Sequence, residues 1–151
     1  MTQKTVLFLC TGNYYRSRFA EILFNWTASQ RKLDWVADSR GLRLEPLNPG
    51  PISVFTLNRL EEMGVPVDDP IRFPQPVTAQ DFQTAHHVVA VKEAEHRPMI
   101  ERFFPEWTER VEFWRVHDVD CAGPEIALPE LQHLVAELID RLTESPRPSP
   151  S

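Results

Sequence analysis

The chain has 151 residues and a mass of 17.5 kDa, enough for one globular domain with its own hydrophobic core and too little for a second large one. Its composition, 42% hydrophobic and 25% charged, excludes a wholly disordered, collagen-like or low-complexity protein. The formal net charge of -6 argues against broad, sequence-independent binding to nucleic acid, so any anion site has to be local.

Cysteine content and hydropathy narrow the class of protein further. Only Cys10 and Cys121 are present, which excludes a disulfide framework and a four-thiolate zinc site. The apolar runs are far shorter than the roughly 20 residues that span a membrane, and the first residues lack the apolar stretch of a secretory signal. We therefore expect a cytoplasmic protein. Its five scattered histidines lack partners at ligand spacing, so we expect no metal and no other cofactor.

Strand and helix patterns alternate from the start of the chain. Residues 5–10 form an apolar run typical of a strand that is buried on both faces of a parallel sheet. Helical spacing of apolar residues follows over 17–32, and residues 35–39 are predicted as a second strand. Another helix begins near Val54 and ends at Gly64, which can adopt a positive φ just beyond the last turn.

The same alternation continues through the middle of the chain. Residues 78–81, T-A-Q-D, have the spacing of a capping box and predict a short helix. A third strand is expected at 87–91. A helix over 93–104 follows, in which Pro98 has to lie in the first turn or begin a new segment.

The last third predicts a fourth strand at 111–116 and an amphipathic helix over 131–142, with Pro129 at its beginning. Alternating strands and helices indicate an α/β fold: one three-layer domain with a four-stranded, parallel, twisted sheet and helices on both faces. We assign this domain to residues 1–143. The Pro- and Ser-rich residues 144–151 have nothing but proline rings to bury and are expected to be a disordered tail.

The loop after the first predicted strand carries the residues of an anion site. Cys10 stands at the carboxyl end of that strand, where open α/β sheets bind ligands, and Arg16 follows six positions later. Backbone N–H groups of a tight loop and of a first helical turn point toward a bound anion. Gly12 permits a positive φ or a close backbone approach, and Asn13 tolerates the left-handed region. The loop therefore fits a phosphate cradle.

The residues of this cradle also predict a catalytic reaction at the loop. Its positive field stabilises a thiolate, so Cys10 is expected to be a nucleophile, and Arg16 can clamp two phosphate oxygens. Ser17 either caps the following helix or donates a hydrogen bond to the thiolate, and the sequence leaves both roles open. The alternative is a buried core cysteine beside a solvated arginine. Five suitable residue types in cradle positions favour the catalytic interpretation.

Residues 6–21, V-L-F-L-C-T-G-N-Y-Y-R-S-R-F-A-E, resemble the signature of the low-molecular-weight protein tyrosine phosphatases and their arsenate reductase relatives. Weaker likeness covers nearly the whole chain, through residues 38–41, 60–64, 77–82, 88–90, 95–96 and 114–118. The resemblance implies a four-stranded parallel sheet flanked by helices, and metal-free hydrolysis of phosphate monoesters.

The resemblance also implies roles. In that family the loop cysteine attacks phosphorus, the arginine binds the equatorial oxygens, and an aspartate after the last strand protonates the leaving oxygen and later activates water. By position these residues are Cys10, Arg16 and Asp118. The remaining phosphate-binding positions are Thr11, Gly12, Asn13, Tyr14, Tyr15 and Ser17. The family's proline and aromatics are absent after Asp118, so Asp120 competes as the acid and specificity for phosphotyrosine stays open.

Three further features depart from the family pattern. Tyr15 replaces a second loop cysteine that can trap the oxidised nucleophile as a disulfide, so Cys10 lacks that protection. Tyr14 stands where a smaller side chain lines the pocket mouth, and it either forms a wall of the entrance or packs under the loop. The histidine that supports the loop asparagine has no obvious counterpart in residues 69–72. We expect the loop to be made rigid differently.

Two further functions remain as alternatives. Thr11 gives the C-T-G-N form common in arsenate reductases; Cys121 is the one further cysteine available, whereas reduction by an external thiol needs Cys10 alone. The atypical sequence after Asp118 allows a non-catalytic phosphate or phosphoprotein binding module. For the phosphatase we expect a phosphorylated protein or a small aryl phosphate as substrate, phosphate or vanadate as a loop ligand, and neither nucleic acid nor a membrane as partner.

Overall fold

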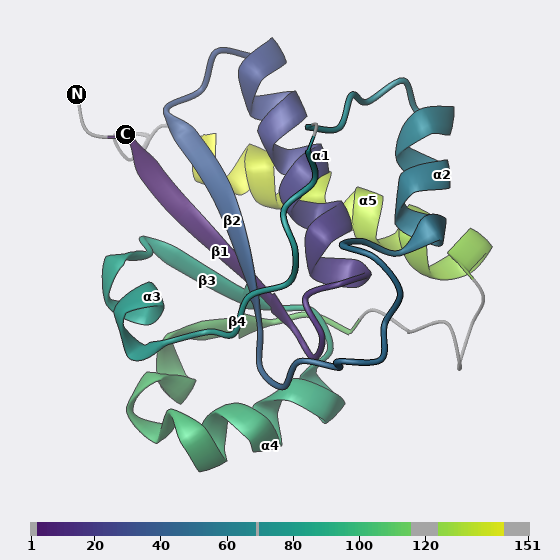
Figure 1. Cartoon of the computed structure of the whole chain (residues 1–151). Helices are drawn as coiled ribbons and strands as arrows, with labels where there is room; N and C mark the ends of the chain where they lie inside the picture. The colour runs from purple at the N-terminus through teal and green to yellow at the C-terminus, as the bar shows by residue number, and fades with distance from the viewer. Residues whose placement is uncertain (1–2, 69, 116–123, 144–151) are drawn as a thin grey trace, which may run out of the picture.

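The computed structural model describes residues 3–68, 70–115 and 124–143. Four strands form an all-parallel sheet in the order β2-β1-β3-β4. The strands are β1 (Lys4–Cys10), β2 (Trp35–Gly41), β3 (His87–Ala90) and β4 (Val111–Phe113). One face of the sheet is covered by α1 (Arg16–Gln30), α2 (Val54–Glu62) and α5 (Pro124–Thr143), and the other by α3 (Ala79–Thr84), α4 (Glu93–Phe103) and the 3-10 helix η1 (Pro105–Arg110) (Figure 1). The predicted fold class is confirmed.

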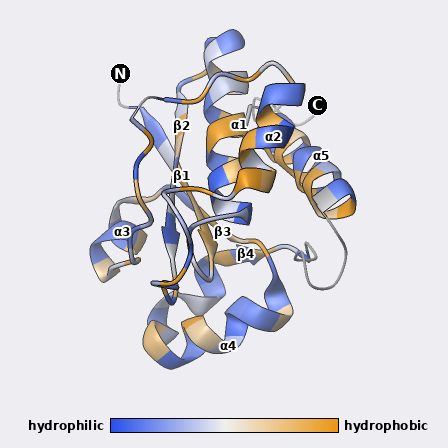
Figure 2. Cartoon of the chain, turned by 45° about the vertical axis from the view of Figure 1, so that its right-hand side comes forward, coloured by the Kyte–Doolittle hydropathy of each residue, from blue (hydrophilic) through white to orange (hydrophobic). Residues whose placement is uncertain are grey.

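The central strand β1 contributes to a hydrophobic core on each face. Successive side chains of a strand point to opposite faces of the sheet. Val6 and Phe8 therefore join the core under α1 and α5, whereas Leu7 and Leu9 join the core under α3 and α4. Figure 2 shows hydrophobic residues along α1, α2 and α5, where these helices lie side by side.

The strand order places a topological switch point at the carboxyl end of β1. The chain passes from β1 outward to β2, then returns to add β3 on the other side of β1. Open α/β sheets bind ligands at such a switch point, outside the carboxyl ends of the strands. Cys10 is the last residue of β1, and Lys92 lies just after β3. The chain segments that follow these two strands therefore lie at this switch point.

Most element signals in the sequence are confirmed. Gly64 ends α2 with a φ of 74°, and Thr78 and Asp81 form both hydrogen bonds of the capping box at the start of α3. No helix in the described ranges is long and apolar enough to cross a membrane.

The positions predicted for two prolines within their helices were wrong. Pro98 and Pro129 lie inside α4 and α5, each as the sixth helical residue, and α5 begins earlier, at Pro124. The first four N–H groups of a helix have no partner within the helix, so a proline this close to the start removes one hydrogen bond of the ladder. The 3-10 helix η1 was not predicted. The end of the predicted fourth strand at 116 and the predicted tail at 144–151 lie outside the described residues.

Candidate active site

The loop from Cys10 to Arg16 joins β1 to α1 and contains one left-handed residue. Asn13 has a φ of 51°, as its residue type predicts, and Gly12 is not among the described residues with positive φ. No side chain caps α1, and its first turn holds no acidic residue. The positive end of this helix is therefore left to an anion.

Cys10 is a free thiol with 2% of its surface exposed, and its Sγ lies 2.9 Å from Oγ of Ser17. The Ser17 oxygen also accepts a hydrogen bond of 2.9 Å from Nδ2 of Asn13. Because the amide occupies one lone pair of the hydroxyl, the Ser17 hydrogen is free to point at a thiolate. Of the two roles left open for Ser17, the structure shows the contact with sulfur and not the helix cap.

Asn13 is fully buried and makes four hydrogen bonds with its side chain. Its Nδ2 donates to Oγ of Ser17 and to Oγ of Ser39, at 2.9 and 2.8 Å. Its Oδ1 accepts from Nη1 of Arg72 at 3.1 Å and from the backbone N–H of Gln75 at 3.0 Å. These four bonds use both N–H groups and both oxygen lone pairs of the amide, so the Asn13 side chain is fully bonded and holds the loop in place.

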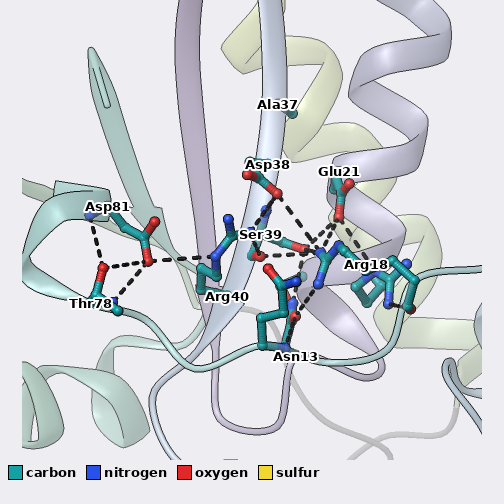
Figure 3. Close-up of polar contacts among 12 residues, drawn as sticks. Asn13, Arg18, Glu21, Ala37, Asp38, Ser39, Arg40, Thr78 and Asp81 are labelled. Atoms are coloured by element: carbon teal, nitrogen blue, oxygen red, sulfur yellow. Dashed lines mark hydrogen bonds and ion pairs between the residues drawn. The ribbon is translucent and has the colours of Figure 1, made fainter. Parts of the chain in front are cut away.

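Arg72 supports the loop asparagine, in agreement with the expectation that the loop is made rigid without a histidine in residues 69–72. Besides its bond to Asn13, Arg72 donates from Nη2 to Oγ and to the carbonyl of Ser39, at 3.1 and 3.2 Å. The same nitrogen lies 3.2 Å from Oε1 of Glu21, which also pairs with the buried Arg18 (Figure 3). Burial lowers the pKa of Arg18, and the Glu21 carboxylate opposes this shift. In this chain the support for the loop asparagine therefore comes from an arginine.

Arg16 is buried, with 6% of its surface exposed, and its Nη2 lies 3.3 Å from Oε2 of Glu95. Its Nε and Nη1 are buried and have no hydrogen-bond partner among the described residues. Buried donors without an acceptor cost free energy, and nearly all such groups in folded proteins find a partner. Two donors of Arg16 are therefore available to an anion at the loop.

Glu95 brings further polar groups to the loop. Its Oε2 accepts hydrogen bonds from Oγ1 of Thr11 and from Nε2 of His96, the latter at 3.3 Å. The bond from His96, then that from Thr11 and the charge of Arg16, hold the pKa of Glu95 well below its usual range, although burial opposes this.

His96 is fully buried, and burial lowers its pKa although Glu95 opposes the shift. Its Nδ1 accepts from the backbone N–H of Lys92 at 3.1 Å. The neutral ring therefore carries its hydrogen on Nε2, where it donates toward Glu95 and Thr11.

The two tyrosines of the loop have different surroundings. The Tyr14 hydroxyl donates to the carbonyl of Pro49 at 2.6 Å, and the Tyr14 carbonyl accepts from the N–H of Ser53. Tyr14 thus joins the loop to the segment before α2 and is not packed away beneath it. Tyr15 packs against the core under α1 and α5, with its ring 6.3 Å from that of Phe55 in an edge-on arrangement.

Gly41, at the end of β2, lies directly against the loop. A Cβ atom at this position would be 2.8 Å from the carbonyl oxygen of Thr11 and 3.2 Å from Cβ of Asn13. The next residue, Leu42, donates its N–H to the carbonyl of Cys10 at 2.9 Å. The backbone of β2 therefore approaches the loop so closely that only glycine fits.

The structure brings together the predicted loop residues Cys10, Thr11, Gly12, Asn13, Tyr14, Tyr15, Arg16 and Ser17. Asp118, Asp120 and Cys121 lie outside the described residues.

Sequence reasoning gave no role to Glu95 and His96. Both follow the third strand, the neighbour of β1, so their approach to the loop could have been inferred from the meeting of strand ends. In the ranges the structure covers, no three His, Cys, Asp or Glu side chains gather to hold a metal ion.

Fold and site together define an α/β protein with a cysteine-arginine loop at the switch point of its sheet. The family model described as low molecular weight phosphotyrosine protein phosphatase matches residues 5–133. The chain therefore belongs to this family, whose members are cysteine-dependent phosphatases.

Individual relatives differ in their stated activity. An arsenate reductase from Staphylococcus aureus is 33% identical over 69 residues, which are 46% of this chain and 47% of that protein, so the chain spans about half the length of the curated relatives it matches. The low molecular weight protein tyrosine phosphatase from T. tengcongensis superposes with a TM-score of 0.78 at 25% identity, over 91% of this chain and 99% of the other. The YwlE arginine phosphatase from Geobacillus stearothermophilus, at 24% identity and a TM-score of 0.74 over 92% of each chain, shares the fold.

Proposed function

We propose that the protein hydrolyses phosphate monoesters without a metal, as a phosphatase of the protein tyrosine phosphatase type with a phosphocysteine intermediate on Cys10. One observation carries the proposal: Arg16 is buried with Nε and Nη1 unpartnered among the described residues, at the end of a loop that begins at the buried Cys10. A phosphoryl group supplies the oxygens that such a guanidinium lacks, and the sulfur supplies the nucleophile.

The proposed reaction has two displacements at phosphorus. The Cys10 thiolate forms an S–P bond while the P–O bond to the leaving group breaks, and Asp118 gives its proton to the leaving oxygen. Water then attacks the phosphocysteine, Asp118 takes a proton from that water, and the S–P bond breaks to release phosphate and thiolate. Arg16 and the loop amides stabilise the charge on the equatorial oxygens in both steps. Ser17 stabilises the thiolate as it leaves.

The direct test is turnover of a small aryl phosphate in the presence of a metal chelator. We expect hydrolysis, inhibition by vanadate, and loss of turnover in Cys10→Ser and in Arg16→Ala. Cys121→Ser is the matched control and retains the wild-type rate. Full activity of Cys10→Ser would eliminate the phosphocysteine mechanism.

The assignment of the general acid has its own test. Asp118→Ala slows substrates with poor leaving groups far more than activated ones, because only the poor leaving groups need a proton. If Asp120→Ala shows this selectivity and Asp118→Ala does not, Asp120 is the acid.

Reduction of arsenate is the second candidate, because curated relatives are arsenate reductases and this chain has the C-T-G-N form of the loop. The assay supplies arsenate and a low-molecular-weight thiol as the two-electron reductant, and measures arsenite. Arsenite formed by wild type and not by Cys10→Ser supports the reductase.

Binding of a phosphopeptide without turnover supports a binding module instead. A phosphorylated protein as substrate and a cytoplasmic location stay predictions.

A further inference from the structure

We infer that Glu95 is the positioning residue of the site: it holds the Arg16 guanidinium so that one two-donor edge faces the phosphoryl group. This inference rests on the proposed function for the identity of the anion. The contacts of Arg16, the fixation of Glu95 and the charge of its carboxylate each lead to it.

Arg16 has one side-chain partner in the described part of the chain, and that partner leaves its other two nitrogens free. Only Nη2 bonds to Glu95, at 3.3 Å, whereas Nε and Nη1 are buried without a partner there. Nη2 carries two hydrogens and Glu95 uses one of them. The other hydrogen lies beside the unpartnered N–H of Nε or of Nη1. Glu95 therefore fixes the guanidinium and still leaves a fork that matches two phosphate oxygens.

Glu95 is itself fixed to the loop and to the helix after β3. Its Oε2 is held by Thr11, in the loop, and by His96, which is fully buried and bonded in turn to the N–H of Lys92. Glu95 is the third residue of α4, where the positive end of the helix dipole stabilises a carboxylate. The loop, the arginine and the start of α4 thus meet at one carboxylate oxygen.

The negative charge of Glu95 indicates that this residue positions Arg16 and does not itself bind the substrate anion. A carboxylate beside the cradle repels an incoming phosphate, so it cannot add to ground-state affinity. Its benefit lies in the transition state, where preorganised donors aimed at the equatorial oxygens lower the barrier. The hydrogen bond from His96 keeps the pKa of Glu95 low, so the carboxylate stays charged at neutral pH.

The chain offers a matched control in the same helical turn. Glu93 pairs with Arg97 at 2.9 Å and with Arg115 at 3.4 Å, and neither arginine belongs to the loop. Glu93→Gln therefore removes the same charge, two residues away, without freeing Arg16.

The first test is the steady-state hydrolysis of an aryl phosphate. We expect Glu95→Gln to lower kcat about tenfold, the scale of one charge-assisted hydrogen bond, while KM stays unchanged or falls. Glu93→Gln leaves both constants near the wild-type values. A Glu95→Gln enzyme that turns over at the wild-type kcat overturns the positioning role.

The second test needs no turnover and compares two anions by calorimetry. Vanadate adopts the five-coordinate geometry of the transition state and inorganic phosphate does not. In Glu95→Gln the preference for vanadate over phosphate is expected to fall about tenfold, with no change in Glu93→Gln. Wild-type protein without turnover would overturn the proposed function, whereas an unchanged preference in Glu95→Gln overturns the inference. If Glu95→Gln does not fold, Thr11→Val, which removes one donor to Glu95 without changing charge, must lower the same preference.

Discussion

Ser17 lies between the side chains of Asn13 and Cys10. Asn13 donates to its oxygen, and its own hydrogen is available to the thiolate of Cys10, whose sulfur lies 2.9 Å away. Hydrogen bonds to a charged group contribute about 1.5–3 kcal/mol, so we expect Ser17→Ala to lower kcat roughly tenfold to a hundredfold. The measurement is kcat with an aryl phosphate, together with the rate of alkylation of Cys10, which falls as the thiolate loses a donor.

Ser29→Ala provides the comparison, since Ser29 is an exposed serine of the same helix. Equal rates for Ser17→Ala and Ser29→Ala would mean that the Ser17 hydroxyl contributes nothing to the sulfur.

Arg72 contributes to the loop through Asn13, at a distance from the sulfur. It bonds to Asn13, Ser39 and Glu21, so removing it leaves a buried amide oxygen and a carboxylate short of donors. For Arg72→Met we expect the free energy of unfolding to fall by about 2–3 kcal/mol and the affinity for inorganic phosphate to fall with it. Urea unfolding and calorimetry measure the two effects.

Arg43→Met is the control for Arg72→Met, because Arg43 is an exposed arginine on the segment after β2. A stable Arg72→Met protein with wild-type phosphate affinity contradicts the role of Arg72 in holding the loop.

These residues mark what sequence alone could and could not predict of the site. Cys10, Asn13 and Arg16 lie within seven positions, so local spacing and loop chemistry were enough to predict their meeting. The partners of the loop come from far along the chain: Arg72 is 59 positions from Asn13, and Glu95 is 79 positions from Arg16. Such pairs follow only from the packing of elements, which periodicity does not determine.

At the scale of elements, hydrophobic period and capping predicted the type and order of the strands and of most helices. The prediction failed where proline was expected only at the start of a helix or in its first turn. Pro98 and Pro129 lie inside α4 and α5 because a proline near a helix start removes a single ladder bond, which the packing of Ile100 and Leu131 in the two cores offsets. Tertiary packing thus overrides a local signal.

The contact of β2 with the loop gives a prediction at this scale. In Gly41→Ala the new Cβ lies 2.8 Å from the carbonyl oxygen of Thr11, so the strand end or the loop has to move. We expect a loss of about 1–3 kcal/mol in the free energy of unfolding and a weaker affinity for phosphate. Gly64→Asn, at an open position where asparagine tolerates the positive φ, is the comparison. Wild-type phosphate affinity in Gly41→Ala would show that β2 does not constrain the loop.

At the scale of the whole molecule, the carboxylate of Glu112 connects α5 to the sheet. Glu112 of β4 accepts from both terminal nitrogens of Arg141 near the end of α5, at 3.1 and 2.7 Å. It also bonds to Nε1 of Trp114 at 2.6 Å and to Nε2 of His87, on β3, at 2.8 Å. Among the described residues, this cluster is a polar link between α5 and the sheet.

The cluster makes the stability of the fold depend on pH in a predictable direction. Burial acts to raise the pKa of Glu112, but the hydrogen bonds from His87, Arg141 and Trp114 outweigh it and hold that pKa below the ordinary value of 4.5. The unfolded chain therefore binds a proton at Glu112 before the folded one does. The stabilising contribution of Glu112 is complete above about pH 4.5 and is lost as the pH falls further.

We therefore expect Glu112→Gln to be less stable than wild type by about 1.5 kcal/mol at neutral pH, a modest figure because Arg141 is half exposed. The difference shrinks as the pH falls below 4.5, since glutamine does not titrate. Urea unfolding at a series of pH values measures it. Glu101→Gln, at an exposed position of α4, is the comparison. A difference between wild type and Glu112→Gln that stays constant down to about pH 3 would mean that the link from β4 to α5 does not depend on an ionised carboxylate.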